Sequence, residues 1–139
     1  MSHTARLDHF PPLVGEQAPE QRRVMTQAVI SAYADASGDN NPIHLDLEFA
    51  RRAGLPATIA HGLLTLGTAC AAIEVWAQDA AWVGRVSCRF AAPVPAGEEL
   101  SCGGEVRASG PTSASVELAV LTSTGERALS KARVELRAS

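Results

Sequence analysis

Hydrophobic residues change their spacing part-way along this chain, from a helical pattern to strict alternation. Residues 62–77 are apolar on nearly every side until Glu74, which predicts a long helix that is buried on several sides. After Trp82, apolar and polar residues alternate in four runs that are separated by turns rich in Pro, Gly and Thr, a pattern typical of half-buried strands. The predicted strands lie near 83–92, 98–109, 113–123 and 127–137.

The apolar members of each run are expected to point to one common face of an antiparallel sheet. Only the 62–77 helix is apolar enough to cover that face, so we predict an α+β domain in which a long central helix is wrapped by a curved antiparallel sheet. The residues predicted to face the helix are Val86, Cys88 and Phe90; Leu100, Cys102 and Val106; Val116, Leu118 and Val120; and Ala132, Val134 and Leu136.

Two shorter helices are predicted before the central one. Thr26 is placed to cap a helix over 27–36, which Gly38 ends. Asp46 is placed to cap a second helix over 46–53, whose last turn is basic. Between these helices the sequence favours an irregular polar turn.

The start of the chain is rich in proline and has little periodicity. Residues 1–12 are expected to be flexible, the following residues to form an extended arm along the domain, and 21–25 to form a short strand. No linker, repeat or low-complexity tract interrupts the chain, and we therefore predict a single domain over 1–139.

Composition narrows the functional classes. The net charge of -3 indicates no basic face for nucleic acid, and no apolar run is long enough to span a membrane. The three cysteines, Cys70, Cys88 and Cys102, are odd in number and lack metal-type spacing, so we expect reduced thiols and a cytoplasmic protein. Nothing in the sequence calls for a cofactor.

Candidate chemistry is concentrated in the stretch Ser-Gly-Asp-Asn-Asn-Pro-Ile-His at 37–44. It places the carboxylate of Asp39 and the imidazole of His44 five positions apart, among residues that favour a turn. Taken alone, Asp39 fits a turn or capping residue and His44 a hydrogen-bonded structural histidine. Together they form a pair suited to acid and base catalysis.

A second polar pair, His61 and Gly62, opens the predicted central helix. The backbone amide of a glycine at a helix N-terminus is a hydrogen-bond donor in a region of positive potential, and the missing side chain lets another molecule come close. Such a donor can stabilise the oxyanion that forms on an activated carbonyl.

The 37–44 stretch and the block Ala-His-Gly-Leu-Leu at 60–64 resemble the two signature blocks of the MaoC-like (R)-specific enoyl-CoA hydratases and (3R)-hydroxyacyl-ACP dehydratases. The resemblance extends from about Val14 to the last strand and is closest to the catalytic subunit of mycobacterial-type dehydratases. It implies a hot dog fold and an acyl-CoA or acyl-ACP thioester substrate. It also implies a homodimer, or a heterodimer with a related hot dog subunit.

The resemblance assigns catalytic roles to Asp39, His44 and Gly62, with Asn41, Ser37 and His61 in substrate binding or loop support. The implied reaction is the (R)-specific hydration of trans-2-enoyl thioesters, or the reverse dehydration, which makes the chain a hydro-lyase of fatty-acid metabolism. Two positions depart from the family pattern. Ala36 replaces a larger aliphatic residue, and Cys70 replaces a serine that assists near the site in some members.

Three alternatives remain open at this level. Asp39, His44 and His61 could hold a metal ion, but they lack His-x-x-x-His spacing and a Cys partner, so no metal is predicted. The chain could instead be a non-catalytic acyl-thioester-binding or structural subunit, although it retains the Asp39 and His44 pair. A thioesterase would need a carboxylate near the helix start, and Glu74 lies three turns further along.

Overall fold

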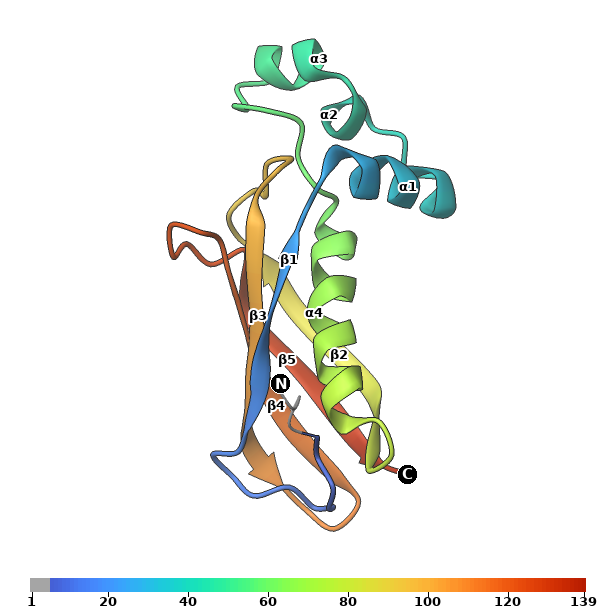
Figure 1. The fold of residues 1–139 in the computed structure, drawn as a ribbon, viewed down its shortest axis with the longest axis vertical. Helices are drawn as coiled ribbons and strands as arrows, with labels where there is room; N and C mark the ends of the chain where they lie inside the picture. The colour runs from blue at the N-terminus through green and yellow to red at the C-terminus, as the bar shows by residue number, and fades with distance from the viewer. Residues whose placement is uncertain (1–5) are drawn as a thin grey trace, which may run out of the picture.

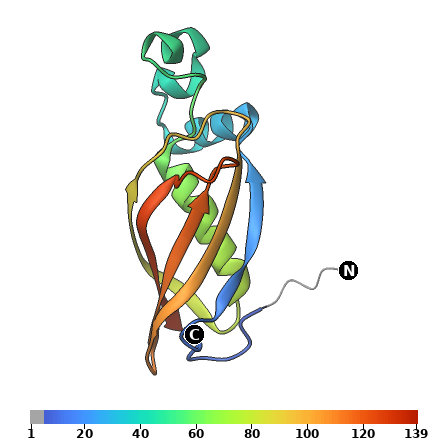
Figure 2. The same ribbon diagram turned by 90° about the vertical axis from the view of Figure 1, so that its left-hand side faces the viewer.

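The computed structural model describes residues 6–139, which form one curved antiparallel sheet around a long helix (Figures 1 and 2). The strand order is β1-β3-β4-β5-β2, and every neighbouring pair is antiparallel. The predicted α+β architecture is confirmed. In chain order the elements are β1 (Gln17–Val24), α1 (Gln27–Ser37), α2 (Pro42–Leu45), α3 (Leu47–Arg52), α4 (Gly62–Ala77), β2 (Ala81–Phe90), β3 (Glu99–Ser109), β4 (Ser113–Leu121) and β5 (Leu129–Ala138).

The central helix α4 has the predicted bounds but is buried on fewer sides than predicted. Ala69, Ile73 and Ala77 face the sheet and are at most 1% exposed. On other parts of the helix surface, Leu63 and Val75 are 63% and 39% exposed. The sheet therefore covers one broad face of α4 and leaves an apolar surface open.

The alternating pattern identifies the core correctly in three strands. Leu100 in β3, Val116 in β4 and Val134 in β5 are fully buried, in line with their predicted orientation. In β2 the predicted burial is wrong, because Val86 and Phe90 are 39% and 57% exposed, although the Phe90 ring does lie against the start of α4. The reason is geometric, because β2 lies at the edge of the sheet, irregularities interrupt its register with β5, and one helix is too narrow to cover five curved strands.

Close packing between α4 and the sheet depends on a glycine in β3. A Cβ atom at Gly104 would lie 2.8 Å from Val116 Cγ1 and 2.9 Å from Ile73 Cδ1, both in the core. The adjacent Gly103 points to the opposite face, where a Cβ atom would meet nothing within 4 Å. Of these two glycines, only Gly104 is required by the packing of the core.

The segments before α4 follow the predicted capping residues. The Thr26 side chain accepts a hydrogen bond from the Val29 amide at the start of α1, and Gly38 ends α1 with a left-handed φ of 78°. Asp46 caps α3 by accepting from the Phe49 amide. These three short helices lie beyond one end of the sheet, above the N-terminus of α4 (Figure 1).

Two expectations about the start of the chain need correction. β1 begins at Gln17, four residues before the predicted strand, because it pairs with β3 over a longer stretch. Residues 6–12 were expected to be flexible, but Leu7 is 4% exposed and its amide donates to Trp76 O at 2.8 Å. The remainder of that expectation, 1–5, lies outside the described residues. Among residues 6–139, no helix is long and apolar enough to cross a membrane.

We predict that Gly104→Ala lowers the free energy of unfolding by about 1–3 kcal/mol, because the new methyl group must displace side chains in a close-packed core. Gly103→Ala is the matched control and should change the stability by much less. Urea unfolding of the two variants tests the prediction. Equal stability of both variants would contradict the assigned orientation of β3.

Candidate active site at the start of the central helix

The stretch 37–44 combines a turn with one turn of helix. The Asp39 amide donates to Ser37 Oγ at 3.1 Å, and the Asn41 amide donates back to Asp39 Oδ1 at 3.2 Å. The Asn41 side chain then caps α2 by accepting from the Ile43 amide at 3.1 Å. The sequence predicted an irregular turn throughout, so His44 lies on a short helix where a loop was expected. Asn41 as the cap and Pro42 in the first turn explain this helix.

His44 is held in one orientation by the backbone. Its side chain is buried, and Nδ1 lies 2.7 Å from Ile59 O. A carbonyl oxygen can only accept, so Nδ1 must carry the proton in this bond. In the neutral ring Nε2 therefore has a free lone pair and can accept a proton from another molecule.

His61 connects the polar turn to the central helix. Its ring is 2% exposed and Nε2 donates to Asp39 O at 3.0 Å, which leaves the lone pair on Nδ1. Within residues 6–139 that buried nitrogen has no hydrogen-bond partner. The ring stacks on His44 with centroids 3.7 Å apart, and the edge of Tyr33 meets it at a centroid distance of 4.7 Å.

These contacts bring three sequence-predicted side chains together. One carboxylate oxygen of Asp39 and one ring nitrogen each of His44 and His61 lie within 4.8 Å of one another. Both rings are buried, whereas Asp39 is exposed. The arrangement forms an acid-base cluster that is open on the Asp39 side.

The same three side chains fit a shared metal ion poorly. The lone pair of an imidazole nitrogen lies in the plane of the ring, so two ligating rings must aim their planes at one point. Here the planes differ by only 22° and are stacked at 3.7 Å, so the two lone pairs lie in nearly parallel planes that do not converge on one nearby point. His44 Nδ1 and His61 Nε2 are in addition occupied by the backbone.

Gly62 is the first residue of α4 and lies next to this cluster in the chain. His61 occupies the N-cap position but makes no side-chain cap hydrogen bond, so its side chain leaves the amides of the first turn unbound. A Cβ atom at Gly62 would lie 2.8 Å from the ring of Phe90. Glycine at this position therefore lets the Phe90 ring pack against the helix start.

Gln27 and Thr58 support the site and were missed in the sequence. Gln27 Nε2 donates to His44 O at 2.9 Å, and Gln27 Oε1 accepts from Thr58 Oγ1 at 2.5 Å. The Ile59 amide also donates to Ile43 O at 3.1 Å. Together these bonds hold α1, α2 and the segment before α4 to one another. A glutamine next to a helix cap gives no local sign of such a role, because its partners lie 17 and 31 residues away.

A pocket of about 190 Å³ lies beside Gly62. It is lined largely by apolar residues from four places, namely the segment before α4, the start of α4 itself, the chain around Phe90 and the start of β5. The cysteines take no part in the acid-base cluster. Burial raises the pKa of the Cys70 thiol, with a further contribution from Glu74, and raises that of Cys102 to about 11, so both thiols are protonated at neutral pH.

Comparisons with known proteins identify the family. The profile of the MaoC like domain matches residues 11–126. The chain belongs to the MaoC-like domain family. The 3-hydroxyacyl-thioester dehydratase X of Mycobacterium tuberculosis is 41% identical over 86 residues, which cover 60% of this chain and 30% of that protein. Other matched relatives are named enoyl-CoA hydratases and fatty acid synthase subunits.

Solved structures of MaoC-like proteins share the fold. An R-hydratase from Pseudomonas aeruginosa in the unliganded form matches with a TM-score of 0.83 and 27% identity, over 91% of this chain and 82% of that one. One chain of the ChsH1-ChsH2 complex from Mycobacterium tuberculosis matches with a TM-score of 0.83 and 24% identity, over 91% and 98%. The architecture of this MaoC-like chain is the hot dog fold. The chain spans about half or less of the length of the curated relatives it matches.

We predict that Gln27→Ala loosens α2 and lowers the free energy of unfolding by about 1–2 kcal/mol, because the hydrogen bonds to His44 and Thr58 are lost. Denaturant unfolding measures the stability, and hydrogen exchange of the Ile59 amide reports the local opening. Gln21→Ala, the same change in β1, is the control. Unchanged protection of Ile59 in the Gln27 variant would contradict the supporting role.

Proposed function

We propose that this chain catalyses the (R)-specific hydration of trans-2-enoyl thioesters, or the reverse dehydration of (3R)-3-hydroxyacyl thioesters. The observation that carries the proposal is the cluster of Asp39 and His44 beside the N-terminus of α4, in which the tautomer of His44 leaves Nε2 free. The family matches, whose relatives are named hydratases and dehydratases, support the same reaction class.

In the hydration direction, one water molecule is held between the Asp39 carboxylate and His44 Nε2. The pair removes a proton from this water as its oxygen bonds to C3 of the enoyl group. The electron pair of the double bond moves towards the thioester, whose oxygen becomes an enolate. A proton held by the pair then passes to C2, so water is added and no redox partner is needed.

The enolate oxygen needs a donor that is in place before the reaction. The Gly62 amide opens a helix of 16 residues, so it combines a free N–H with the positive end of the helix dipole. The apolar pocket beside Gly62 is placed to receive the part of the acyl chain next to the thioester. His61 holds the backbone of Asp39 and packs on His44, and it acts in this scheme as a positioning residue.

We predict that Asp39→Asn and His44→Ala each lower the turnover of an enoyl thioester by about two to four powers of ten. Because both groups act on one water molecule, the double variant should be little slower than either single variant. Loss of enoyl absorbance with crotonyl-CoA and a longer enoyl-CoA measures the rate. Chiral analysis of the product tests the (R) configuration.

Two controls separate chemistry from structure. Asp35→Asn makes the same chemical change on the exposed side of α1 and should leave turnover unchanged, as should Cys70→Ala on α4. Near-wild-type hydration by the Asp39 variant would refute the acid-base assignment. A wild-type chain that binds acyl thioesters without turning them over, with partner subunits present, would establish the non-catalytic alternative.

A thioesterase is a weaker candidate on the same fold. Glu74 is the one carboxylate on α4, and it lies twelve residues after Gly62. At about 1.5 Å per residue the two positions are roughly 18 Å apart along the helix. That carboxylate cannot act on a thioester carbonyl bound at the Gly62 amide.

We also propose that the working unit is a dimer, formed with a second copy or with a related hot dog subunit. The edge strand β2 exposes Trp82, Val86 and Phe90 at 54%, 39% and 57%, and α4 exposes Leu63. An unpaired edge with apolar side chains is suited to pairing with another chain. One of the structural neighbours is a chain from the ChsH1-ChsH2 complex, which contains two different subunits.

We predict that light scattering detects a dimer at micromolar concentration, alone or with the related subunit. Val86→Lys on the edge strand should weaken the dimer, because a charge would enter an apolar contact. Lys131→Gln, on the outer face of β5, serves as the surface control. A wild-type chain that is monomeric and fully active at high concentration would contradict the proposal.

A further inference from the structure

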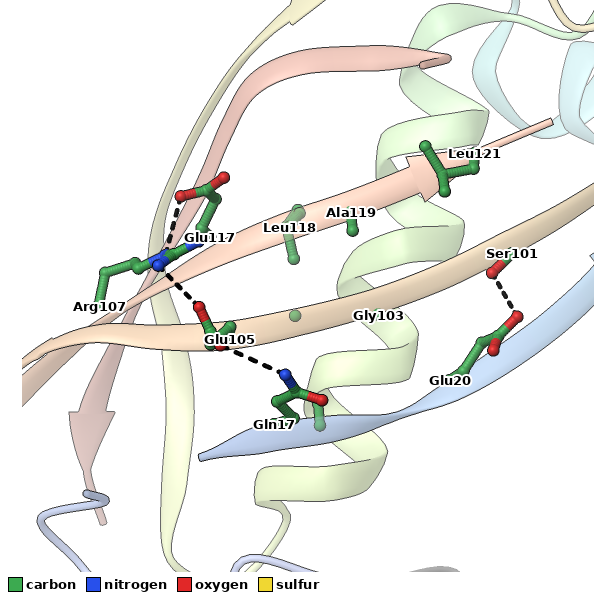
Figure 3. A pocket seen from close by; sticks show the side chains of 12 residues that line it. Gln17, Glu20, Ser101, Gly103, Glu105, Arg107, Glu117, Leu118, Ala119 and Leu121 are labelled. Carbon is green, nitrogen blue, oxygen red and sulfur yellow. Dashed lines mark hydrogen bonds and ion pairs between the residues drawn. The ribbon is translucent and has the colours of Figure 1, made fainter. Parts of the chain in front are cut away.

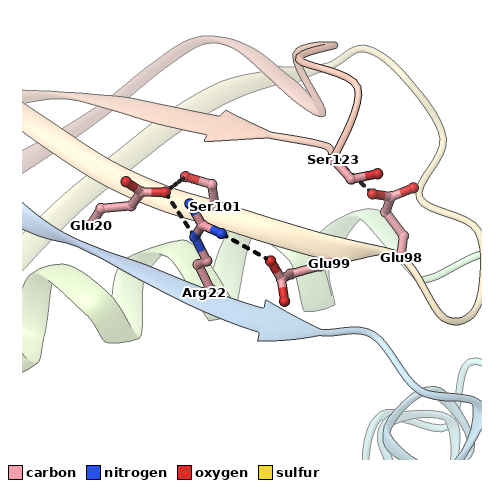
Figure 4. Close-up of polar contacts among 6 residues, drawn as sticks. All are labelled: Glu20, Arg22, Glu98, Glu99, Ser101 and Ser123. Carbon is pink, nitrogen blue, oxygen red and sulfur yellow. Dashed lines mark hydrogen bonds and ion pairs between the residues drawn. The ribbon is translucent and has the colours of Figure 1, made fainter.

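The outer face of the sheet, turned away from α4, is divided by charge. On the β1, β3 and β4 side each arginine is shared between two carboxylates. Arg22 lies 3.3 Å from Glu20 and 3.5 Å from Glu99 (Figure 4). Arg107 lies 2.8 Å from Glu105 and 3.0 Å from Glu117, beside a shallow pocket on this face (Figure 3). This half therefore carries an excess of negative charge.

The opposite half carries unpaired positive charge. The unpaired cations come from β2, β5 and the turn before β5, and all of them are exposed, whereas Arg137 on β5 is paired with Glu135 at 2.9 Å. Among residues 6–139 none of the five lies within ion-pair distance of a carboxylate. We call this set the basic strip, and it consists of Arg85, Arg89, Arg127, Lys131 and Arg133.

Strand register places Arg85, Arg89 and Arg133 on one face. Arg85 pairs with Glu135, Ser87 with Arg133 and Arg89 with Ser130, so these side chains alternate with the buried Val134 and Leu136. From Arg85 to Arg89 the strip runs about 13 Å along β2 at the usual rise of a strand. It is an extended surface, wider than a single phosphate group.

Such a strip is unexpected in a chain whose net charge is -3. Like charges repel across a sheet, and solvated faces usually mix the two signs. Five unpaired cations instead create a local positive field that attracts and orients an anionic partner. The net charge alone does not reveal this grouping of cations, because the total hides where the two signs lie on the sheet.

A hollow within the strip is a candidate binding site for a carboxylate. It measures about 420 Å³, and its polar lining includes Arg85, Arg133, Ser115 and the carboxylate of Glu135. Ser115 Oγ is buried and has no hydrogen-bond partner within residues 6–139. A carboxylate placed here would accept hydrogen bonds from the two guanidinium groups and the hydroxyl. Glu135, on the wall of the hollow, is already paired with Arg137 at 2.9 Å and does not neutralise Arg85 or Arg133.

One end of the strip lies beside the active site. Arg89 directly precedes Phe90, whose ring occupies the space over Gly62. The carbonyl of Arg127 accepts from the Ala92 amide at 3.0 Å, and Ala92 lines the pocket next to Gly62. A partner that covers the strip would thus stand at the end of the sheet where the thioester is processed.

We propose that the basic strip is the docking surface for an acidic carrier protein that delivers the acyl group as its thioester. The proposal rests on the hydratase or dehydratase function and names the carrier. An acidic helix presents carboxylates every three or four residues along one side, which matches an extended row of cations. Coenzyme A offers its phosphates at a few points only and leaves most of the strip uncovered.

The test compares Arg85→Gln/Arg133→Gln with Arg6→Gln/Arg23→Gln, a control pair that removes the same charge elsewhere. Binding of holo acyl carrier protein without an acyl group is measured by surface plasmon resonance at two salt concentrations. Turnover is measured with the same enoyl group on the carrier protein and on CoA. Thermal unfolding confirms that both double variants are folded.

We expect the strip variant to bind the carrier protein about tenfold more weakly than wild type, with a smaller salt dependence. Its kcat/KM should fall to a similar degree with the carrier-linked substrate, mainly through KM, and should be unchanged with CoA. Equal losses on both substrates would show that the strip binds CoA phosphates. No carrier binding by wild type, or tighter binding of single-stranded DNA, would also overturn the proposal.

The outcome is separable from that of the proposed reaction. If the carrier protein does not bind but enoyl-CoA turnover is normal, the docking role of the basic strip is refuted and the proposed hydratase function is not. Salt-dependent binding of the carrier protein by a chain that turns over neither thioester would support the strip and refute the hydratase function.

Discussion

The site depends on two imidazole rings whose hydrogen bonds go to the backbone. His44 Nδ1 binds Ile59 O, and His61 Nε2 binds Asp39 O, so each ring fixes the segment that carries its partner. The two rings then stack, which joins the polar turn to the start of α4. Because the nitrogens are bound to carbonyl oxygens, the tautomer of each ring is set and one lone pair of each remains free. The acid-base cluster follows from this crossed arrangement.

The hot dog architecture supplies the remaining constraints on the site. The sheet curves around one face of α4, so the helix N-terminus meets the end of β2, and Phe90 fills the space that a side chain at Gly62 would need. The same curvature leaves β2 as an edge with exposed apolar residues and turns its charged side outward. The packing at the candidate site, the surface suited to a partner subunit and part of the basic strip therefore share a single strand.

Charge along this chain shows how a total misleads when position matters. Arg22 and Arg107 are each held between two glutamates, whereas among the described cations of β2 and β5 only Arg137 has an ion-pair partner, Glu135. In sequence the two sets look alike, since both alternate with apolar core positions. They differ because strand order places β1 and β3 together at one side and β5 and β2 at the other.

Local rules in the sequence determined the central helix, its glycine start, the capping roles of Thr26 and Asp46, and the inward face of β3, β4 and β5. These features depend on side-chain periodicity and on neighbours a few residues away, which a sequence displays directly. Tertiary structure alone decided the exposure of β2, the brace formed by Gln27 and Thr58, and the stacking of His44 on His61. Each depends on segments 15 to 31 residues apart meeting in space, or on which strand ends at an edge. The spacing of apolar residues along the sequence contains no information about long-range contacts or about the position of a strand in the sheet.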